Sequence, residues 1–340
     1  AELYGMEPKK ITRHHLYKIS RMLNKDKENI EAWLSTRTGD LFEFQDKIVL
    51  YDLTNTYFEG EKSYSTKAKF GKSKEKRNDA KLMALAMVTD SSGFIKYSKI
   101  YEGNIKDNQT LQTTLCELES YANKTKPKKR HVAHRKVVVI DAGIATEDNL
   151  RLLRQQKYDY VCVSLAKMNK IRIDEIEKTG IELKDKKDNK IWVQWVKSPE
   201  HDDQILYVKS QKKQLKEQGM EDLFCKRYEE GLLAIKKGIE KKGGTKKSNK
   251  IYERLGRLKE KYTSINRYYK VNIQVKEDVV SGMQWEKTSS GKNRQGVYFV
   301  RTSLSGKDEK TIWNIYNTIR EIEATFRTLK TDLNMRPVFH

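Results

Sequence analysis

Residues 47–60, KIVLYDLTNTYFEG, carry the pattern that decides the fold. A short run of β-branched and apolar residues ends in an acid, Asp52, which is typical of a buried strand that opens into a crevice at its carboxyl end. Residues 135–144, RKVVVIDAGI, repeat this pattern and end their apolar run in Asp141. An acid in that position is partly removed from water, and this costs free energy unless a cation or a hydrogen-bond donor compensates it.

Two interpretations of these acids are open. If the two strands are neighbours, Asp52 and Asp141 lie side by side, and a divalent cation would remove the repulsion between them. Mg²⁺ is the natural candidate because it prefers hard oxygen ligands. Alternatively, each Asp caps the turn that follows its strand, which is a common role for this residue.

The surrounding sequence predicts a mixed α/β core. Taken with the two acid-bearing strands, it reads in the order β-β-β-α-β-α-β, which predicts a mixed sheet flanked by helices. Thr146 is placed to cap the second of these helices, which ends near residue 156. The other predicted elements of the core are strands at 82–89 and 94–101, a helix at 110–122 and a strand at 158–166.

Further elements surround and interrupt this core. Residues 10–38 predict two helices, and 310–333 predict one uninterrupted helix. Between 167 and 307 the pattern changes to short strands at 171–176, 191–196 and 204–208, a Lys-rich helical region, a helix at 249–262, and strands within 268–287 and 296–302. We therefore expect an N-terminal helical segment (1–46), the first part of a catalytic core (47–166), an insertion subdomain (167–307) and the second part of the core (308–340).

The last predicted helix has a charged face beside its apolar face. At 100° per residue, five residues fall within a stripe about 80° wide. The alternative is ion pairing between residues one helical turn apart on a solvated surface. The stripe consists of Tyr316, Arg320, Glu323, Arg327 and Lys330, and the neighbouring apolar face of Ile319, Ile322, Phe326 and Leu329.

The charge balance indicates a polyanionic partner. The chain has 69 Lys and Arg against 47 Asp and Glu, a formal net charge of +22. Nucleic acid is the first expectation and an anionic membrane surface the second. No apolar run approaches the roughly 20 residues of a membrane span, and no helix joins a broad basic face to exposed Trp, Phe or Leu. Three scattered cysteines form no disulfide framework, which favours a reducing cytosol.

Basic segments flank both acid-bearing strands in sequence. We expect them to contact backbone phosphates of DNA, with strongly salt-dependent binding. The alternative is a solvated charge run with no partner. The residues concerned are Lys72, Lys74 and Arg77 within 62–77, and Lys128, Lys129 and Arg130 within 124–136.

Six blocks, in order along residues 51–340, resemble bacterial insertion-sequence DDE transposases. The group in question has a β-rich insertion before its catalytic Glu and a Y-(2)-R-(3)-E-(6)-K signature. Tyr316, Glu323 and Lys330 match the signature's spacing, whereas its Arg position holds Ile319 and Arg320 stands one residue later. The blocks are YDLTNTYFEG (51–60), GKSKEKRND (71–79), YEGNIKDNQT (101–110), VVVIDAGIA (137–145), GVYFVRTSL (296–304) and IEATFRTLKTDLNMRPVFH (322–340).

The resemblance implies an RNase H-like fold and a catalytic triad of Asp52, Asp141 and Glu323. It also implies two Mg²⁺ ions, for which Mn²⁺ substitutes. We expect Asp52 to bridge both ions, Asp141 to bind one and Glu323 the other. Water would first cut the transposon end, and the freed 3′-OH would then attack target DNA. Tyr316, Arg320, Arg327 and Lys330 would contact DNA near the cut.

The resemblance also sets expectations for partners and location. The implied partners are duplex DNA, as terminal inverted repeats and as target, and a second copy of the chain on that DNA. The implied location is the bacterial cytoplasm, at the nucleoid. In related transposases an aromatic residue in or near the insertion traps a flipped base. By residue type alone, Trp192, Trp195 and Trp285 are candidates, and a packing role is the alternative for each.

Two other functions stay open at this point. One is an RNase H-like nuclease with the same metals that hydrolyses DNA without strand transfer. The other is a truncated, inactive DNA-binding remnant of a transposase, because the chain runs from Ala1 to His340 while family members usually carry more sequence on both sides.

Overall fold

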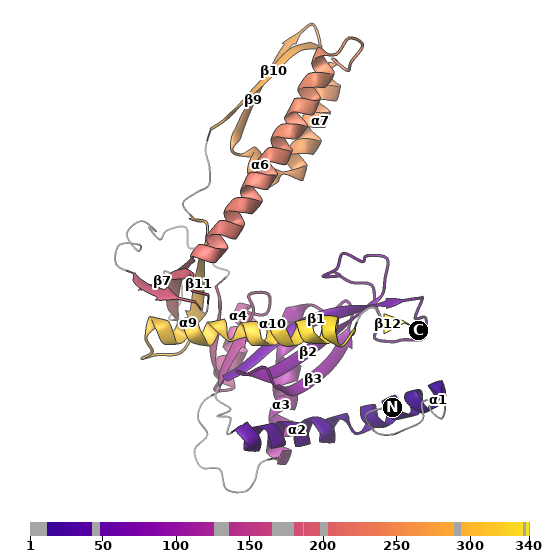
Figure 1. Ribbon diagram of the computed structural model, residues 1–340, viewed down its shortest axis with the longest axis vertical. Coiled ribbons are helices and arrows are strands. Elements are labelled where there is room, and N and C mark those ends of the chain that lie inside the picture. Colours follow the sequence, from indigo (N-terminus) through magenta and orange to yellow (C-terminus); the bar gives the residue numbers. More distant parts are fainter. Residues whose placement is uncertain are drawn as a thin grey trace. The chain divides into compact units, whose positions relative to one another are not determined.

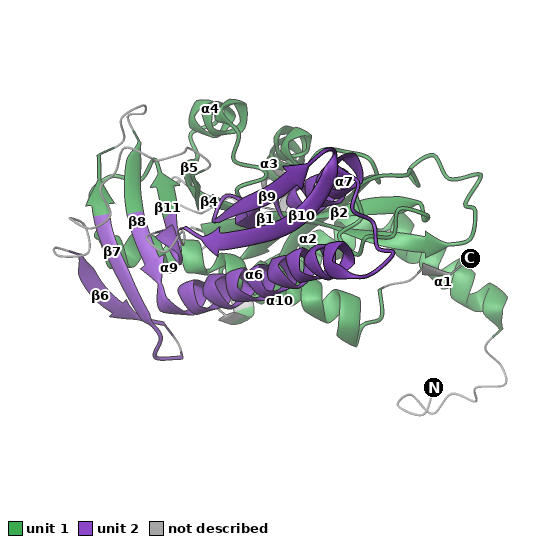
Figure 2. Cartoon of the chain, turned by 90° about the horizontal axis from the view of Figure 1, so that it is seen from above, with its two compact units in different colours: residues 1–167, 195–206, 299–340 green, residues 168–194, 207–298 purple. Residues whose placement is uncertain are grey.

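The computed structural model of the chain describes residues 12–42, 48–125, 136–164, 180–185, 187–197, 203–288, 294–335 and 338–339 (Figure 1). The chain forms two compact units (Figure 2). Unit 1 comprises Ala1–Lys167, Trp195–Leu206 and Phe299–His340, and unit 2 comprises Met168–Gln194 and Tyr207–Tyr298. These bounds differ from the expected insertion at 167–307, because β11 (Val297–Thr302) pairs with a core strand, β5 (Asp159–Val163), at Val300 and Val163.

Unit 1 is built on a mixed sheet with the strand order β3-β2-β1-β4-β5-β11. The first three strands form an antiparallel meander, β4 runs parallel to β1, and β5 runs parallel to β4. This is the mixed sheet that the sequence predicted. The residue ranges of the other strands are Ile48–Glu59 (β1), Leu82–Asp90 (β2), Ile95–Glu102 (β3) and Val137–Ile140 (β4).

Helices cover both faces of this sheet (Figures 1 and 2). The face of α3 and α4 contains the core of unit 1, in which Tyr51 and Leu53 of β1 are almost fully buried. Because side chains alternate across a strand, Asp52 faces the opposite side, where α10 lies. Thr146 caps α4 as predicted, accepting the N–H of Asn149. The helices named here are α3 (Leu111–Thr125), α4 (Glu147–Gln155) and α10 (Ile319–Arg327).

The N-terminal helices are present as predicted, as α1 (Arg13–Lys25) and α2 (Lys27–Phe42). Lys27 of α2 donates to the carbonyl of Ser98 on β3 at 2.6 Å, and the Ser98 hydroxyl donates to Glu31. These contacts hold α2 against β3. By contrast, α1 has no buried residue.

The predicted single helix at the C-terminal end is divided. It consists of α9 (Glu309–Asn317), α10 and a π-helical turn, η5 (Thr328–Asp332). The first division has a local cause, because the Thr318 hydroxyl donates to the Ile315 carbonyl at 2.6 Å and the Glu321 N–H bonds to Thr318 three residues back. Beyond η5, β12 (Val338–Phe339) pairs in parallel with the end of β1.

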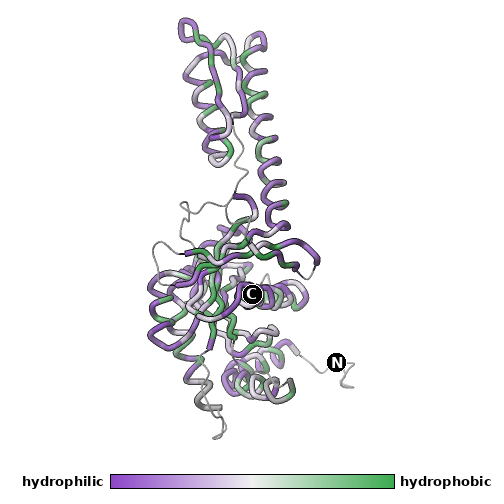
Figure 3. The backbone as a smooth tube through the Cα atoms, turned by 90° about the vertical axis from the view of Figure 1, so that its left-hand side faces the viewer, coloured by the Kyte–Doolittle hydropathy of each residue, from purple (hydrophilic) through white to green (hydrophobic). Residues whose placement is uncertain are grey.

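Unit 2 has its own apolar core, formed by three helices and a hairpin. In Figure 3 apolar and polar residues alternate along the helices, as expected where one face of each is buried. The core includes Tyr228, Leu232, Ile251 and Val280. The predicted strand at 171–176 lies outside the described residues, and one strand, β6, was not predicted. The elements are β6 (Ile181–Lys184), β7 (Lys190–Val196), β8 (Gln204–Ser210), α6 (Gln211–Glu240), α7 (Ser248–Lys261), α8 (Thr263–Asn266), β9 (Tyr269–Lys276) and β10 (Val279–Lys287), of which β7 and β8 lie partly in unit 1.

Candidate active site

The two strand-end acids are neighbours in unit 1. Strands β1 and β4 are parallel, and Tyr51 is paired with Ile140. Asp52 and Asp141 are the next residues of these two strands, so they lie at the same edge of the sheet. Each carboxylate accepts the N–H of the next residue at 2.7 Å, from Leu53 and from Ala142. The expectation that the two strands are adjacent is therefore confirmed.

The Asp52 side chain is half-buried, so its carboxylate is partly removed from water. Burial raises its pKa from 3.8 to about 6, although Lys74 and the Leu53 N–H act in the opposite direction. The charges of Asp141 and Asp107 add to the rise. A carboxylate in this state gains free energy from any cation that can reach it.

The loop 71–79 brings Lys74 to this position. The Asn55 side chain, three residues after Asp52, donates to the Lys72 carbonyl at 3.0 Å and accepts the Lys74 N–H at 3.4 Å. Lys74 Nζ then donates to the Leu53 carbonyl at 2.7 Å. Gly71 lets the loop begin there, because a Cβ on it would lie 2.2 Å from a neighbouring carbonyl oxygen. The sequence analysis missed Asn55, although it stands in the first block that carries the resemblance.

Helix α10 is fixed to the sheet by its apolar face and by one polar contact. Ile322 and Phe326 are buried, as predicted. The Thr325 hydroxyl donates to the carbonyl of Gly93 in the β2–β3 turn at 3.1 Å. At the end of the helical segment, Lys330 interacts electrostatically with both Asp52 and Lys74. The segment that carries Glu323 therefore ends beside Asp52.

Glu323 itself is exposed on α10. Among the residues that the structure describes, no three His, Cys, Asp or Glu side chains lie close enough together to hold a metal ion. The structure thus brings together Asp52 and Asp141, and the role of Glu323 as the third ligand stays a prediction.

The remaining signature residues lie along the same helical segment. Tyr316 is half-buried on α9, whereas Arg320 and Arg327 are exposed on α10. Ile319, at the position where the signature has Arg, is buried. Arg320 is therefore the exposed cation next to that position, and its contact with DNA remains a prediction.

Comparison with known proteins identifies the family. A family model described as "Transposase DDE domain" matches residues 43–338. The chain belongs to the DDE transposase family. No curated protein matches it.

Solved structures of Mos1 mariner transposase are also similar to the structure of this DDE transposase. The "catalytic domain of Mos1 mariner transposase" is 16% identical with a TM-score of 0.25, and the match covers 39% of this chain and 56% of that one. The "Mos1 Strand Transfer Complex" is 19% identical with a TM-score of 0.24, and the match covers 39% of each chain. The match spans less than two thirds of either Mos1 chain.

The basic residues expected on the DNA path of the transposase differ in their surroundings. Lys72 is exposed. Arg77 pairs with Glu59 at 2.9 Å and with Asp79 at 3.0 Å, and its guanidinium lies 4.7 Å from the centre of the Tyr57 ring. These hydrogen bonds raise the pKa of Arg77 above its usual value and compensate its charge. Lys128, Lys129 and Arg130 lie outside the described residues.

The three tryptophans proposed as base traps are all half-buried. Trp192 and Trp195 lie on β7. Trp285 packs against the apolar core of unit 2, and Lys236 Nζ lies 5.9 Å from the centre of its ring. For Trp285 the structure shows the packing role that was the alternative.

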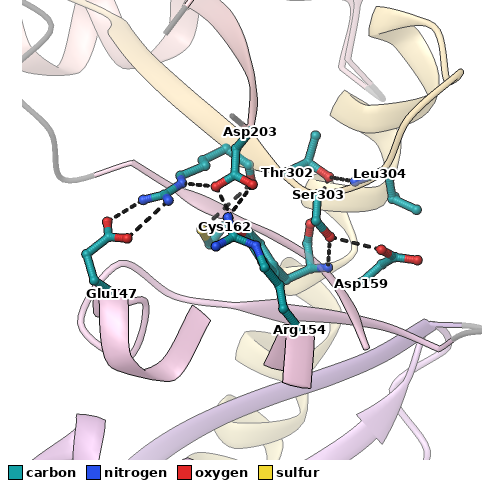
Figure 4. Close-up of polar contacts among 10 residues, drawn as sticks. Glu147, Arg154, Asp159, Cys162, Asp203, Thr302, Ser303 and Leu304 are labelled. Atoms are coloured by element: carbon teal, nitrogen blue, oxygen red, sulfur yellow. Dashed lines mark hydrogen bonds and ion pairs between the residues drawn. The ribbon is translucent and has the colours of Figure 1, made fainter. Parts of the chain in front are cut away.

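A second acid-bearing cluster, which the sequence analysis missed, lies elsewhere in unit 1 (Figure 4). Asp203 and Arg301 are both 5% exposed and form an ion pair, and Asp203 also accepts hydrogen bonds from Arg154 and from Tyr160, the latter at 2.6 Å. Burial raises the pKa of Asp203, but its hydrogen bonds from Tyr160, Arg154 and Arg301 outweigh burial and lower it. Arg301 also pairs with Glu147 of α4. Every charge in this cluster is compensated within the chain, so its role is structural.

Proposed function

We propose that this protein is a DNA transposase that cuts phosphodiester bonds at transposon ends and joins the freed ends to target DNA. Asp52, Asp141 and Glu323 are its catalytic residues. The observation that carries this proposal is the half-buried Asp52 beside the exposed Asp141, at the ends of two paired strands in a chain of the DDE transposase family.

The residues of this site fit a divalent cation. Asp52 and Asp141 offer hard oxygen donors from two adjacent strand ends, and burial, together with the neighbouring charge of Asp141, raises the pKa of Asp52. Asp52 and Asp141 would hold Mg²⁺ or Mn²⁺, with Glu323 as the third carboxylate. When bound, a pair of such ions activates the attacking oxygen and stabilises the leaving oxygen.

The residues around the carboxylates bind and orient the DNA. Lys330 and Lys74 both interact electrostatically with Asp52. A phosphate bound by the two ammonium groups would therefore lie beside the carboxylates. The same helical segment carries Tyr316, Arg320 and Arg327, which would contact the flanking phosphates. Further backbone phosphates would contact the two basic segments, at Lys72, Lys74 and Arg77 and at Lys128, Lys129 and Arg130.

The partners follow from this chemistry. They are duplex DNA, as the terminal inverted repeats of the transposon and as target, and a second copy of the chain that binds the other transposon end. The enzyme would work in the bacterial cytoplasm, at the nucleoid. No helix within the described residues is long and apolar enough to cross a membrane.

The test is Mg²⁺-dependent nicking of terminal-repeat DNA by the wild type and by Asp52→Asn, Asp141→Asn and Glu323→Gln. Each substitution removes one carboxylate charge, and we expect nicking to fall by at least about a hundredfold. Asp148→Asn is the matched control, because the Asp148 side chain is 90% exposed and on α4. Undiminished nicking by any one of the three would remove that residue from the site.

The products distinguish the proposal from its alternatives. Covalently joined donor and target strands support transposition. Hydrolysis without any joined product would indicate an RNase H-like nuclease. DNA binding without cleavage would indicate an inactive remnant.

A further inference from the structure

Lys330 has a carboxylate partner that the signature does not include. Its Nζ lies 3.7 Å from Oε1 of Glu75, in the loop 71–79. The Lys330 side chain is 12% exposed and the Glu75 side chain 20%. An ammonium group removed from water to this extent is costly unless an anion stands nearby. The pair thus accounts for a lysine that burial would otherwise disfavour.

The local structure fixes Glu75 on its side of the pair. The Ser73 hydroxyl donates to Glu75 Oε2 at 3.4 Å, and the Glu75 N–H donates to the same hydroxyl at 3.1 Å. The Asn55 side chain holds the adjacent backbone through its contacts with Lys72 and Lys74. Glu75 therefore stands on a loop that is tied to the strand bearing Asp52.

Two neighbouring residues of this loop, Lys74 and Glu75, act on the charges of the site. Lys74 interacts with the Asp52 carboxylate, and Glu75 with the Lys330 ammonium. Burial and then Lys74 lower the pKa of Lys330, while Asp52 opposes them. If a bound cation compensated the charge of Asp52, Asp52 would attract Lys330 less, whereas the Glu75 carboxylate would still pair with the ammonium.

We propose that Glu75 is a positioning residue that holds Lys330 beside Asp52 for contact with the DNA phosphate. It acts through Lys330 and touches neither the DNA nor the reacting atoms. The pairing is present in the free protein, whereas its effect on DNA cleavage rests on the proposed transposase function.

The first experiment measures the pairing without any activity. The amines of the DNA-free protein are labelled with a limiting acylating reagent, and the rate at Lys330 is read by peptide mass spectrometry. In Glu75→Gln we expect Lys330 to react about three- to fivefold faster, the effect of losing a partly screened ion pair. Glu75→Asp keeps the charge and should stay close to the wild type. Glu61→Gln is the matched control, since it removes the same charge from an exposed position.

The second experiment measures the consequence in nicking of terminal-repeat DNA. Glu75→Gln should lower kcat about three- to tenfold, because Lys330 is no longer oriented, and leave KM almost unchanged. Glu75→Asp should restore kcat. In the Lys330→Gln background, Glu75→Gln should have no further effect, because Glu75 acts only through Lys330.

The outcomes separate this inference from the proposed function. Equal labelling of Lys330 in the wild type and Glu75→Gln overturns the inference, whether or not the protein nicks DNA. Additive losses in the double variant also overturn it, while leaving the transposase function intact. Absence of nicking by the wild type counts against the function, and labelling alone then decides whether Glu75 holds Lys330.

Discussion

Asp203 is buried and Asp52 half-buried, and these two acids of unit 1 are in opposite electrostatic states. Asp203 accepts hydrogen bonds from Arg301, Arg154 and Tyr160, and its pKa is lowered. Asp52 accepts one backbone N–H, has Lys74 nearby, and its pKa is raised to about 6. The same residue type is thus surrounded by the chain's own cations at Asp203, whereas at Asp52 it lies beside a second acid, Asp141.

The difference shows how to recognise a site in this fold. Burial is common to both carboxylates, so burial alone does not distinguish them. The distinguishing feature is a neighbouring acid in place of neighbouring arginines, here Asp141 beside Asp52. A buried carboxylate beside a second carboxylate stores repulsion that a divalent cation can release.

The largest expected effect on stability comes from breaking the compensated cluster. In Asp203→Asn the Arg301 guanidinium, 5% exposed, loses its buried partner. We expect the free energy of unfolding to fall by about 3–5 kcal/mol, as when one member of a buried ion pair is removed. Denaturant unfolding measures this change, with the exposed Asp148→Asn as control. A loss no greater than that of the control would show that the cluster does not stabilise the fold.

Replacing Asp52 should instead raise the free energy of unfolding at neutral and higher pH. The folded-state pKa of Asp52, about 6, exceeds its ordinary 3.8, so its contribution to stability is complete below pH 3.8 and is lost as the pH rises through 6. Asp52→Asn removes this loss. In EDTA at pH 8 the variant should be more stable than the wild type by about 3 kcal/mol, from roughly two pKa units at 1.36 kcal/mol each.

The pH dependence provides the control for Asp52. The difference between Asp52→Asn and the wild type should shrink toward zero near pH 3, where Asp52 is largely protonated in both the folded and the unfolded state. Urea unfolding at several pH values measures it. A wild type as stable as the variant at pH 8 would mean that the carboxylate is compensated after all.

The smallest expected effect is on the salt dependence of DNA binding, where an exposed lysine differs from an arginine held in ion pairs. Lys72 is exposed, whereas Arg77 is bound to Glu59 and Asp79. Lys72→Gln should reduce the slope of log K against log salt for terminal-repeat DNA by about 1. Arg77→Gln should reduce it less, because its acidic partners already compensate its charge. Fluorescence anisotropy at several salt concentrations measures both slopes, and equal reductions would contradict the distinction.

The core was predictable because its signals are local. The apolar runs before Asp52 and Asp141 predicted two buried strands, and Thr146 predicted the start of α4. The division of the last helix was not predicted, because it depends on one hydroxyl, that of Thr318, bonding back along the helix.

The contacts around the site were less predictable, because they join residues far apart in sequence. Lys330 and Glu75 are 255 positions apart in the chain, and no periodicity links them. Arg301 and Asp203 are likewise separated by 98 residues. Residue type indicated which side chains carry charge, but only the fold shows which charges compensate one another.

The most direct test of the central claim is binding of Mn²⁺ to the DNA-free protein, measured by electron paramagnetic resonance. Asp141→Asn is the variant of choice, because Asp141 is exposed and its loss should not unfold the protein. We expect the wild type to bind Mn²⁺ and Asp141→Asn to bind it at least about tenfold more weakly, with the affinity of Asp148→Asn unchanged. Equal Mn²⁺ affinity in the wild type and Asp141→Asn would contradict a cation site at the paired strand-end carboxylates.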